Sequence, residues 1–173
     1  FPSLFGCSIG YAYEQDNWYL VKESELVSTS NTATGLAYYE NNSTAQLYVC
    51  NGQSSDSKIS VYDLNGSLAR NITIANYRST AYDIVLDDNG TIYISEYYSI
   101  TCLANDGTFL WRTGKNASIS ISGSSGSGNG EFYQARGITL GPDGYLYVAD
   151  CRNHRLQVLD KNGGFIRKFG TQG

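Results

Sequence analysis

The side chains best suited to chemistry lie close together near the end of the chain. Asp150, Asn153, His154 and Arg155 fall within one short segment, and His154 is the only histidine present. A histidine near a carboxylate can act as a general base or hold a metal ion. The alternative is structural: Asn153, His154 and Arg155 form a corner at a strand end and hydrogen-bond to loop backbone. Because no second histidine is available, we favour the structural interpretation.

Three further groups of polar residues could supply oxygen ligands to calcium. They are Asp87-Asp88-Asn89, Asn105-Asp106 and Asp143, and each directly precedes a glycine. Calcium needs about six to eight oxygens that converge on one point, which a tight turn does not supply. Asp and Asn before glycine are typical of hairpin turns, because these residues tolerate positive φ. We therefore expect turn residues here and no metal site.

The four cysteines, Cys7, Cys50, Cys102 and Cys151, contain no C-x-x-C spacing. Neither a zinc knuckle nor a redox-active pair is therefore predicted. The sequence also shows no nucleophile beside a base, no phosphate-binding loop and no metal-binding cluster. We expect no catalytic residue and no cofactor in this chain.

Tyrosine is the dominant aromatic residue, with 15 copies against 6 phenylalanines. A tyrosine offers a large contact area with a polar tip, so a surface rich in tyrosine suits the binding of a protein or a sugar. The alternative is that these rings fill gaps between sheets. The candidates at predicted strand ends and loops are Tyr38, Tyr39, Tyr82, Tyr97, Tyr98 and Tyr133.

The segment that carries His154 is a run of short predicted strands. Residues 145–150 are rich in aromatic and β-branched side chains, and residues 156–160 alternate between apolar and polar. Turn sequences at 141–144 and 161–164 separate the strands, which gives four strands joined by hairpins. Such a sheet is partly apolar on both faces, so it must bury both against neighbouring sheets.

The segment from Gly126 to Gly170 resembles the NHL repeat, a four-stranded blade of a β-propeller. In place of the proline common before the first strand, this chain has Ala135-Arg136. The resemblance implies an all-β propeller fold. Propeller enzymes that use metals generally need several histidines around the central channel. The matching residues are Gly128, Gly130, Phe132, Gly137-Ile138, Asp143-Gly144, Tyr147-Val148-Ala149-Asp150, Asn153-His154-Arg155, Leu156 to Leu159 and Phe169-Gly170.

The same pattern recurs twice upstream. It predicts blades over about residues 33–76, 79–118 and 131–170, within one NHL-like propeller segment spanning 33–173. Residues 1–32 predict two short strands, which form part of another blade or an N-terminal extension. The low-complexity stretch 119–130 is interpreted as a loop between blades. Three blades do not close a ring, which usually has about 4 to 8. We favour completion by a longer chain over completion by further copies joined edge to edge.

Alignment of the blades gives several residues equivalent positions. Asp150 corresponds to Glu96 and Asn51, and this repetition favours a structural hydrogen bond over a functional site. Stacked blades could also place Cys102 against Cys151. That would leave Cys7 with Cys50, which is one of the three pairings that four cysteines allow.

Several features point to a secreted protein. The chain begins at Phe1 and contains no methionine, which fits a mature chain after signal removal or an internal fragment. An even number of cysteines agrees with an oxidising compartment, so we predict a secreted, disulfide-bonded glycoprotein. Sequons for N-glycosylation occur at Asn41, Asn42, Asn65, Asn71, Asn89 and Asn116.

The composition argues against two classes of partner. The formal net charge is −4 and no basic stripe accompanies the aromatic residues, so we predict no nucleic-acid binding. No apolar run approaches about 20 residues, so no membrane insertion is expected.

We therefore expect a non-catalytic module for protein or glycan interaction, or for structural assembly, at a cell surface or in an appendage. The alternative is a segment of a propeller lyase or hydrolase whose catalytic residues lie outside this chain. Stoichiometrically bound zinc or calcium in the intact protein would favour the enzyme.

Overall fold

The structure is a computed structural model, and it confirms the predicted all-β class. It describes residues 11–14, 17–20, 33–41, 43–52, 58–73, 80–120 and 123–170 of the 173-residue chain. Within these ranges the helical element is η1 (Cys151–Asn153), a single 3-10 turn. None of the described segments forms a helix of the length and apolarity needed to cross a bilayer.

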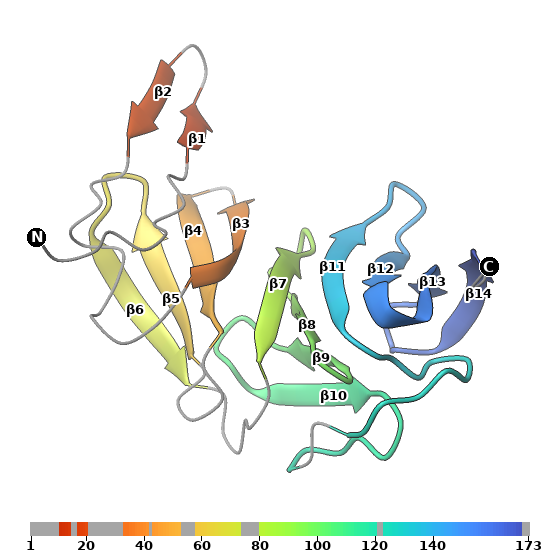
Figure 1. The fold of residues 1–173 in the computed structure, drawn as a ribbon. Coiled ribbons are helices and arrows are strands. Elements are labelled where there is room, and N and C mark those ends of the chain that lie inside the picture. The colour runs from red at the N-terminus through yellow and green to blue at the C-terminus, as the bar shows by residue number, and fades with distance from the viewer. Residues whose placement is uncertain are drawn as a thin grey trace, which may run out of the picture.

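Three four-stranded antiparallel sheets make up the main body, and we call them blades 1, 2 and 3. In each blade the strands pair in the order in which they follow one another along the chain (Figure 1). Blade 1 contains β3 (Ala33–Asn41), β4 (Thr44–Asn51), β5 (Lys58–Asp63) and β6 (Leu68–Thr73). Blade 2 contains β7 (Ala81–Leu86), β8 (Ile92–Glu96), β9 (Ile100–Leu103) and β10 (Phe109–Thr113). Blade 3 contains β11 (Ala135–Leu140), β12 (Leu146–Asp150), β13 (Arg155–Leu159) and β14 (Phe165–Phe169).

A separate hairpin precedes the blades. It consists of β1 (Tyr11–Glu14) and β2 (Asn17–Leu20), which pair with each other in antiparallel register. The sequence predicts strands around residues 9–13 and 18–22, so both strands are confirmed with slightly shifted bounds. The other residues of the predicted segment 1–32 lie outside the described ranges.

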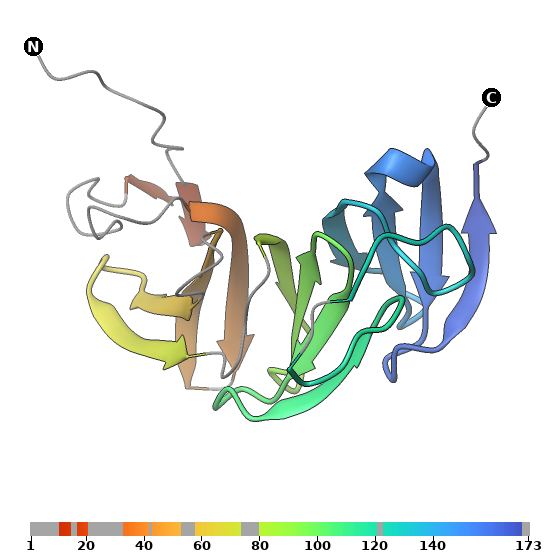
Figure 2. The same ribbon diagram turned by 60° about the horizontal axis from the view of Figure 1, so that its bottom comes forward.

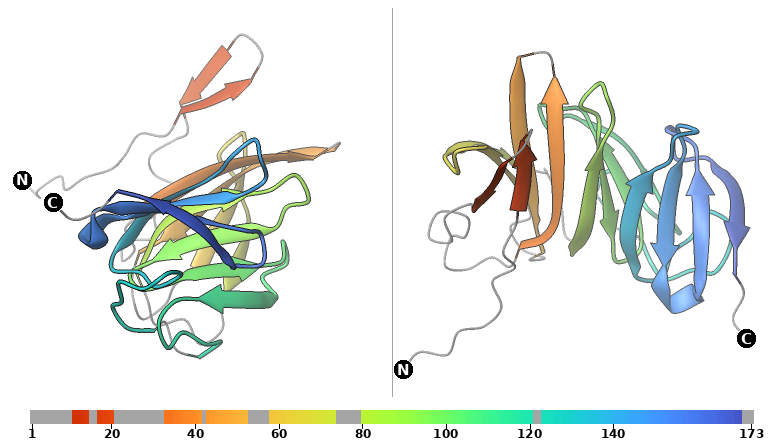
Figure 3. Two further views of the ribbon diagram at one scale, coloured as in Figure 1. Left: turned by 90° about the vertical axis from the view of Figure 1, so that its right-hand side faces the viewer. Right: turned by 90° about the horizontal axis from the view of Figure 1, so that it is seen from above.

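The blades stand side by side in an arc, with β3, β7 and β11 adjacent on its inner side (Figures 1 and 2). The view from above in Figure 3 shows the sheets stacked with neighbouring faces toward one another. This is the arrangement of successive blades in a propeller. The low-complexity stretch lies between β10 and β11, so it is a connection between blades, as predicted.

Apolar side chains fill the two spaces between the blades. Ile59 and Val61 of blade 1 meet Ile92 and Ile94 of blade 2, and all four are fully buried. A second cluster between blades 2 and 3 is built around Phe132, which is also fully buried. Burial of this kind contributes about 1.5–3 kcal/mol for each large apolar side chain, so these two interfaces are the main source of stability.

Each innermost strand carries a β-bulge at the same position. The register shifts between Ala33 and Gly35 in β3, and the same shift occurs in β7 and β11. The residues within the bulges are therefore Thr34, Tyr82 and Arg136. A bulge turns a side chain away from the regular alternation of the strand. Its recurrence confirms that the three sheets are repeats of one unit.

The turn between β13 and β14 reaches across to blade 2. Its Gly163 has φ +83°, a left-handed conformation that favours glycine. A Cβ at Gly163 would lie 2.9 Å from Cζ3 of Trp111 in β10. Gly144, in the turn between β11 and β12, has a similar φ of +79° but no atom within 4 Å of its Cβ position.

Replacing Gly163 with alanine should destabilise the chain more than replacing Gly144. Each alanine would adopt the left-handed conformation, at a cost of about 1 kcal/mol. Only Gly163→Ala would also collide with the Trp111 ring, and overpacking of this kind costs a further ~1–3 kcal/mol. Urea unfolding of both variants measures the difference. Equal destabilisation would contradict the close approach of the blades at Trp111.

Candidate functional site

The polar segment singled out in the sequence holds blade 3 together. Asp150 is fully buried, and its Oδ2 accepts hydrogen bonds from Arg155 Nε and Asn153 Nδ2, each at 2.8 Å. Arg155 also donates to three backbone carbonyl oxygens of the Gly-rich loop before β11. These contacts confirm the interpretation of Asn153 and Arg155 as a structural corner, because their polar groups are engaged in fastening that loop.

Equivalent positions in the other blades form comparable networks. In blade 2 the buried Glu96 accepts a hydrogen bond from Thr101 and pairs with Arg112 at 3.4 Å. In blade 1 Asn51 Nδ2 donates to Ser60 Oγ at 3.4 Å. A structural role is therefore common to all three positions. Removing one partner of a buried pair such as Glu96–Arg112 typically costs about 3–5 kcal/mol, since the other charge is left buried and unpaired.

His154 follows η1 in a left-handed backbone conformation with φ 52°. Its backbone N–H donates to the Cys151 carbonyl oxygen at 3.1 Å, and its side chain is exposed. Across the described ranges, no three or more His, Cys, Asp or Glu side chains are grouped so that they could hold a metal ion. His154 therefore lies at an exposed corner of blade 3.

The acidic residues at the hairpin tips stabilise their own turns, as predicted. Asp87 Oδ1 accepts hydrogen bonds from the Asn89 and Thr91 backbone N–H groups, each at 3.0 Å. Asp106 accepts one from the Thr108 N–H at 2.8 Å, which is the main reason that the pKa of Asp106 is lowered. The Oδ1 atom of each carboxylate thus bonds to its own turn, which agrees with the role predicted for these turn residues.

The disulfide prediction is wrong for the cysteines that the structure describes. Cys50, Cys102 and Cys151 are free thiols, and Cys7 lies outside the described residues. Cys102 lies in the apolar interface between blades 2 and 3, whereas Cys151 is exposed beyond the end of β12. The alignment correctly placed Cys102 and Cys151 on adjacent sheets, but they lie at different positions along the length of the strands. Cys102 is equivalent to Val158, in the middle of its strand, so the two thiols do not meet.

Four of the six candidate tyrosines gather on one surface. The ring of Tyr97 lies 4.6 Å from that of Tyr98, 6.0 Å from Tyr82 and 6.1 Å from Tyr133, measured between centroids. We call these four residues the tyrosine rim. They come from β7, the β8–β9 connection and the segment before β11, so two blades contribute.

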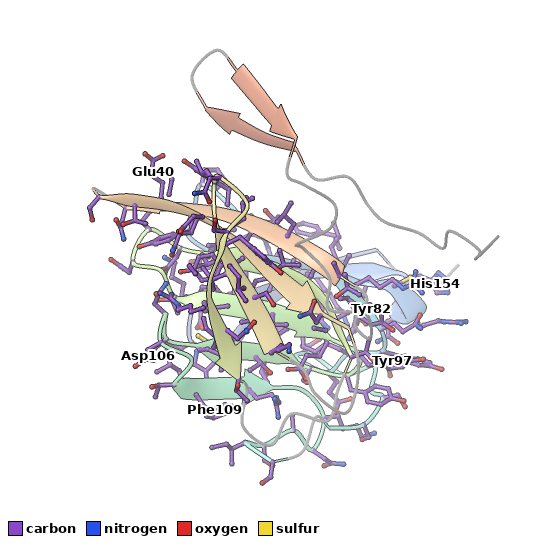
Figure 4. The ribbon with its side chains drawn as sticks, turned by 90° about the vertical axis from the view of Figure 1, so that its left-hand side faces the viewer. Glu40, Tyr82, Tyr97, Asp106, Phe109 and His154 are labelled. Atoms are coloured by element: carbon purple, nitrogen blue, oxygen red, sulfur yellow. The ribbon has the colours of Figure 1, made fainter. Side chains whose placement is uncertain are left out.

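The other two candidates lie apart from the rim on β3. Tyr39 packs edge-on against Tyr48 beside the interface between blades 1 and 2, so the gap-filling alternative describes it. Tyr38 is exposed and donates a hydrogen bond to Glu40 Oε2 at 2.7 Å. In Figure 4 Glu40 lies at the opposite end of the blades from Tyr97.

Backbone features position the rim. Tyr82 is the bulge residue of β7, and Arg136 is the bulge residue of β11. The Arg136 guanidinium lies over the Tyr82 ring at 5.6 Å, a cation–π contact between the blades. Figure 4 shows Tyr82 and Tyr97 on the same side of the molecule as His154.

Tyr133 and Gln134 form a bridge between blades 2 and 3. The Gln134 backbone N–H donates to the Tyr97 carbonyl oxygen at 2.7 Å, and Gln134 Nε2 donates to the Tyr97 hydroxyl at 3.2 Å. On the other side, the carbonyl oxygens of Gln134 and Tyr133 accept from the Cys151 and Arg152 N–H groups, each at 3.0 Å. These bonds fix the backbone of Tyr97 and Tyr133 and the position of the Tyr97 hydroxyl.

The rim is aromatic and positively charged. Arg136 and Arg152 are exposed beside the tyrosines, and Arg152 Nε donates to Gln134 Oε1 at 3.1 Å. Burial, followed by the nearby Tyr97, raises the pKa of Tyr82, so this phenol stays protonated at neutral pH. Phenols and guanidinium groups can stack and donate hydrogen bonds to a ligand.

The sequence pointed to the tyrosines but not to Gln134, Arg136 or Arg152. One signal was available for Arg136: Ala135-Arg136 stands where the NHL pattern commonly has a proline. That departure places a long cationic side chain at the bulge.

Comparison with a family model identifies residues 132–159 as an NHL repeat. The mouse NHL repeat-containing protein 3 is 32% identical over 87 residues, which cover 47% of this chain and 22% of that protein. The chain therefore spans less than a quarter of this relative, and still less of the others that it matches.

Solved structures share the fold. A catalytically inactive H270A virginiamycin B lyase from Staphylococcus aureus, with quinupristin, superimposes with a TM-score of 0.61 at 14% identity, covering 86% of this chain and 44% of that one. The β-propeller domain of Cps50 (Swd1) from Myceliophteria thermophila superimposes with a TM-score of 0.53 at 12% identity, covering 86% and 44%. The chain thus spans about half of these structures.

Alkylation should distinguish the three described thiols. Burial raises the pKa of Cys50 to about 11 and that of Cys102 to about 12, and both side chains are inaccessible, whereas Cys151 is exposed. Iodoacetamide at neutral pH should therefore label Cys151 in the native chain and the other two only after unfolding. Peptide mapping by mass spectrometry measures this. A native disulfide between any two of them would contradict the structure.

Proposed function

We propose, from the premise that this chain is a segment of an NHL-repeat β-propeller, that it is a non-catalytic interaction module of an extracellular glycoprotein. The observation that carries the proposal is the tyrosine rim, where four phenol rings from two blades converge beside two exposed arginines. Its partner would be another protein or a glycan.

The rim has the physical character of a binding surface. Tyrosine and arginine are enriched at interaction hot spots, because they combine large contact area with hydrogen-bonding tips. The bridge of Tyr133 and Gln134 fixes the backbone of Tyr97 and Tyr133 and the Tyr97 hydroxyl, so part of the surface is ordered without a partner. The polar residues that first suggested chemistry, Asp150 and Arg155 among them, are engaged in the architecture of blade 3. This division of roles favours binding over catalysis.

The position of the sequons supports an extracellular glycoprotein. All sequon asparagines that the structure describes are exposed, as attachment of a glycan requires. Asn42 lies outside the described residues. Asn41, Asn65 and Asn89 lie at the hairpin ends of the blades, and Figure 4 shows Glu40 and Asp106, at such ends, far from Tyr97. Glycans there would leave the tyrosine rim open.

Substitution in the rim should weaken partner binding, whereas a matched substitution elsewhere should not. Tyr133→Ser and Arg136→Gln each remove an exposed rim group, and we expect at least a tenfold rise in Kd, equivalent to about 1.4 kcal/mol. Tyr38→Ser removes an exposed tyrosine of blade 1 and serves as the control. Glycan arrays and panels of purified ectodomains supply the partners to be measured. Loss of binding in Tyr38→Ser alone would contradict the proposal.

Expression through a eukaryotic secretory pathway should yield a glycosylated chain. Asn41, Asn65 and Asn89 should be occupied, because each lies exposed in or beside a hairpin turn. Amidase removal of the glycans converts occupied asparagines to aspartates, which peptide mass mapping detects. A secreted chain with none of its sequons occupied would contradict the glycoprotein assignment.

A further inference from the structure

Two rings of the tyrosine rim belong to neighbouring blades and face each other where the blades join. Tyr98 lies in the β8–β9 connection of blade 2, and Tyr133 lies in the segment that leads into β11 of blade 3. Their ring centroids are 6.2 Å apart, and the ring planes are inclined by 32°. Tyr133 is 36% exposed and Tyr98 is partly exposed, so an oxidant in solution can reach both rings.

Two neighbouring phenols can be joined by oxidation. A one-electron oxidant removes an electron and a proton from each hydroxyl group and leaves two phenoxyl radicals. The radicals form a carbon–carbon bond between ring positions ortho to the hydroxyls, and the hydrogen atoms of those two carbons then move to the phenolic oxygens. When a haem peroxidase is the oxidant, the two electrons and two protons reduce one hydrogen peroxide to two waters. The product is a dityrosine.

The other two rings of the rim are less suited to this coupling. Tyr97 lies closer to Tyr98, with centroids 4.6 Å apart, but their planes meet at 69° in an edge-to-face arrangement. Coupling instead joins the edges of two rings. Tyr82 carries the Arg136 guanidinium over its ring at 5.6 Å, and this positive charge opposes the loss of an electron from the ring.

Freedom of rotation then selects between Tyr97 and Tyr98 as the partner of Tyr133. The two rings lie at similar distances from Tyr133, 6.1 Å and 6.2 Å between centroids. The Tyr97 hydroxyl accepts a hydrogen bond from Gln134 Nε2, which restrains its ring. Within the described ranges, no group lies within hydrogen-bond distance of the Tyr98 or Tyr133 hydroxyl. Rotation about the side-chain torsions can therefore bring these two ring edges together.

We infer that Tyr98 and Tyr133 form a site of oxidative cross-linking, where a haem peroxidase and hydrogen peroxide convert the two phenols into a dityrosine that ties blade 2 to blade 3. The cysteines that the structure describes form no disulfide, so the tyrosines supply a covalent tie that those cysteines do not. The inference does not depend on what the rim binds, and the purified chain is sufficient to test it.

The tie would also stabilise the fold. It closes a loop over residues 98–133, which contains β9, β10 and the Gly- and Ser-rich connection between blades 2 and 3. A cross-link of this kind reduces the conformational freedom of the unfolded chain. The linked monomer should therefore unfold at a higher temperature than the untreated chain.

Treatment of the purified chain with a haem peroxidase and equimolar hydrogen peroxide tests the inference. Glycans are first removed and accessible thiols are alkylated, so that thiols do not consume the oxidant. Trypsin places the two tyrosines on separate peptides, 79–112 and 116–136. We expect the monomer fraction to contain these peptides joined, with a mass two hydrogen atoms lower than their sum.

Four conservative variants identify the residues that react. Tyr98→Phe and Tyr133→Phe keep the ring but remove the hydroxyl that is oxidised, and each should reduce the linked peptide pair at least tenfold. Tyr97→Phe should reduce it less than twofold, because Tyr97 is not a coupling partner. Tyr38→Phe, on β3 and apart from the rim, should leave it unchanged. Protection of the buried thiols from iodoacetamide shows that each variant is folded.

Three results would overturn the inference. One is an undiminished linked pair in Tyr98→Phe, which would assign the reaction to another tyrosine. Another is an equal yield from the chain unfolded in urea, which would show that the arrangement of the rim is not needed. The last is a linked monomer that unfolds at no higher temperature than the untreated chain, because the bond would then not tie the blades in their native arrangement.

Discussion

The need to bury both faces of a four-stranded sheet governs this structure. Each blade carries apolar side chains on both faces, so no blade is stable without neighbours. Blade 2 shows the consequence: Ile92 and Ile94 are covered by blade 1, and Tyr93 and Cys102 by blade 3. The turn residues Asn105 and Lys161 add polar contacts between neighbouring blades.

The polar residues are divided between two tasks by the same constraint. Buried polar groups need hydrogen-bond partners, and Asp150, Glu96 and Asn51 lie at buried strand ends. Their side chains therefore form hydrogen bonds within their own blades. At the rim the backbone of Tyr133 and Gln134 bridges blades 2 and 3, while the side chain of Tyr133 is exposed. There the bulge residues Tyr82 and Arg136 project to the surface. The propeller thus separates a rigid framework from a surface that is available for a partner.

Much of this organisation could be predicted from the sequence. The Asp-Gly and Asn-Gly turns and the alternating strands gave three blades, because local turn chemistry and side-chain period determine hairpins. The predicted pairing of Cys102 with Cys151 was wrong. Alignment identifies neighbouring sheets, but it does not show where along the strands each cysteine lies. The cluster of four tyrosines was also hidden, because it depends on bulges that leave no clear mark in sequence.

Native-state hydrogen exchange tests most directly whether contacts between blades hold the fold. If they do, amides of β8 and β9, which are covered on both sides, exchange most slowly and open together with those of β4, β5, β12 and β13 in one cooperative step. Exchange of the three sheets as separate units, each with its own opening free energy, would contradict this account.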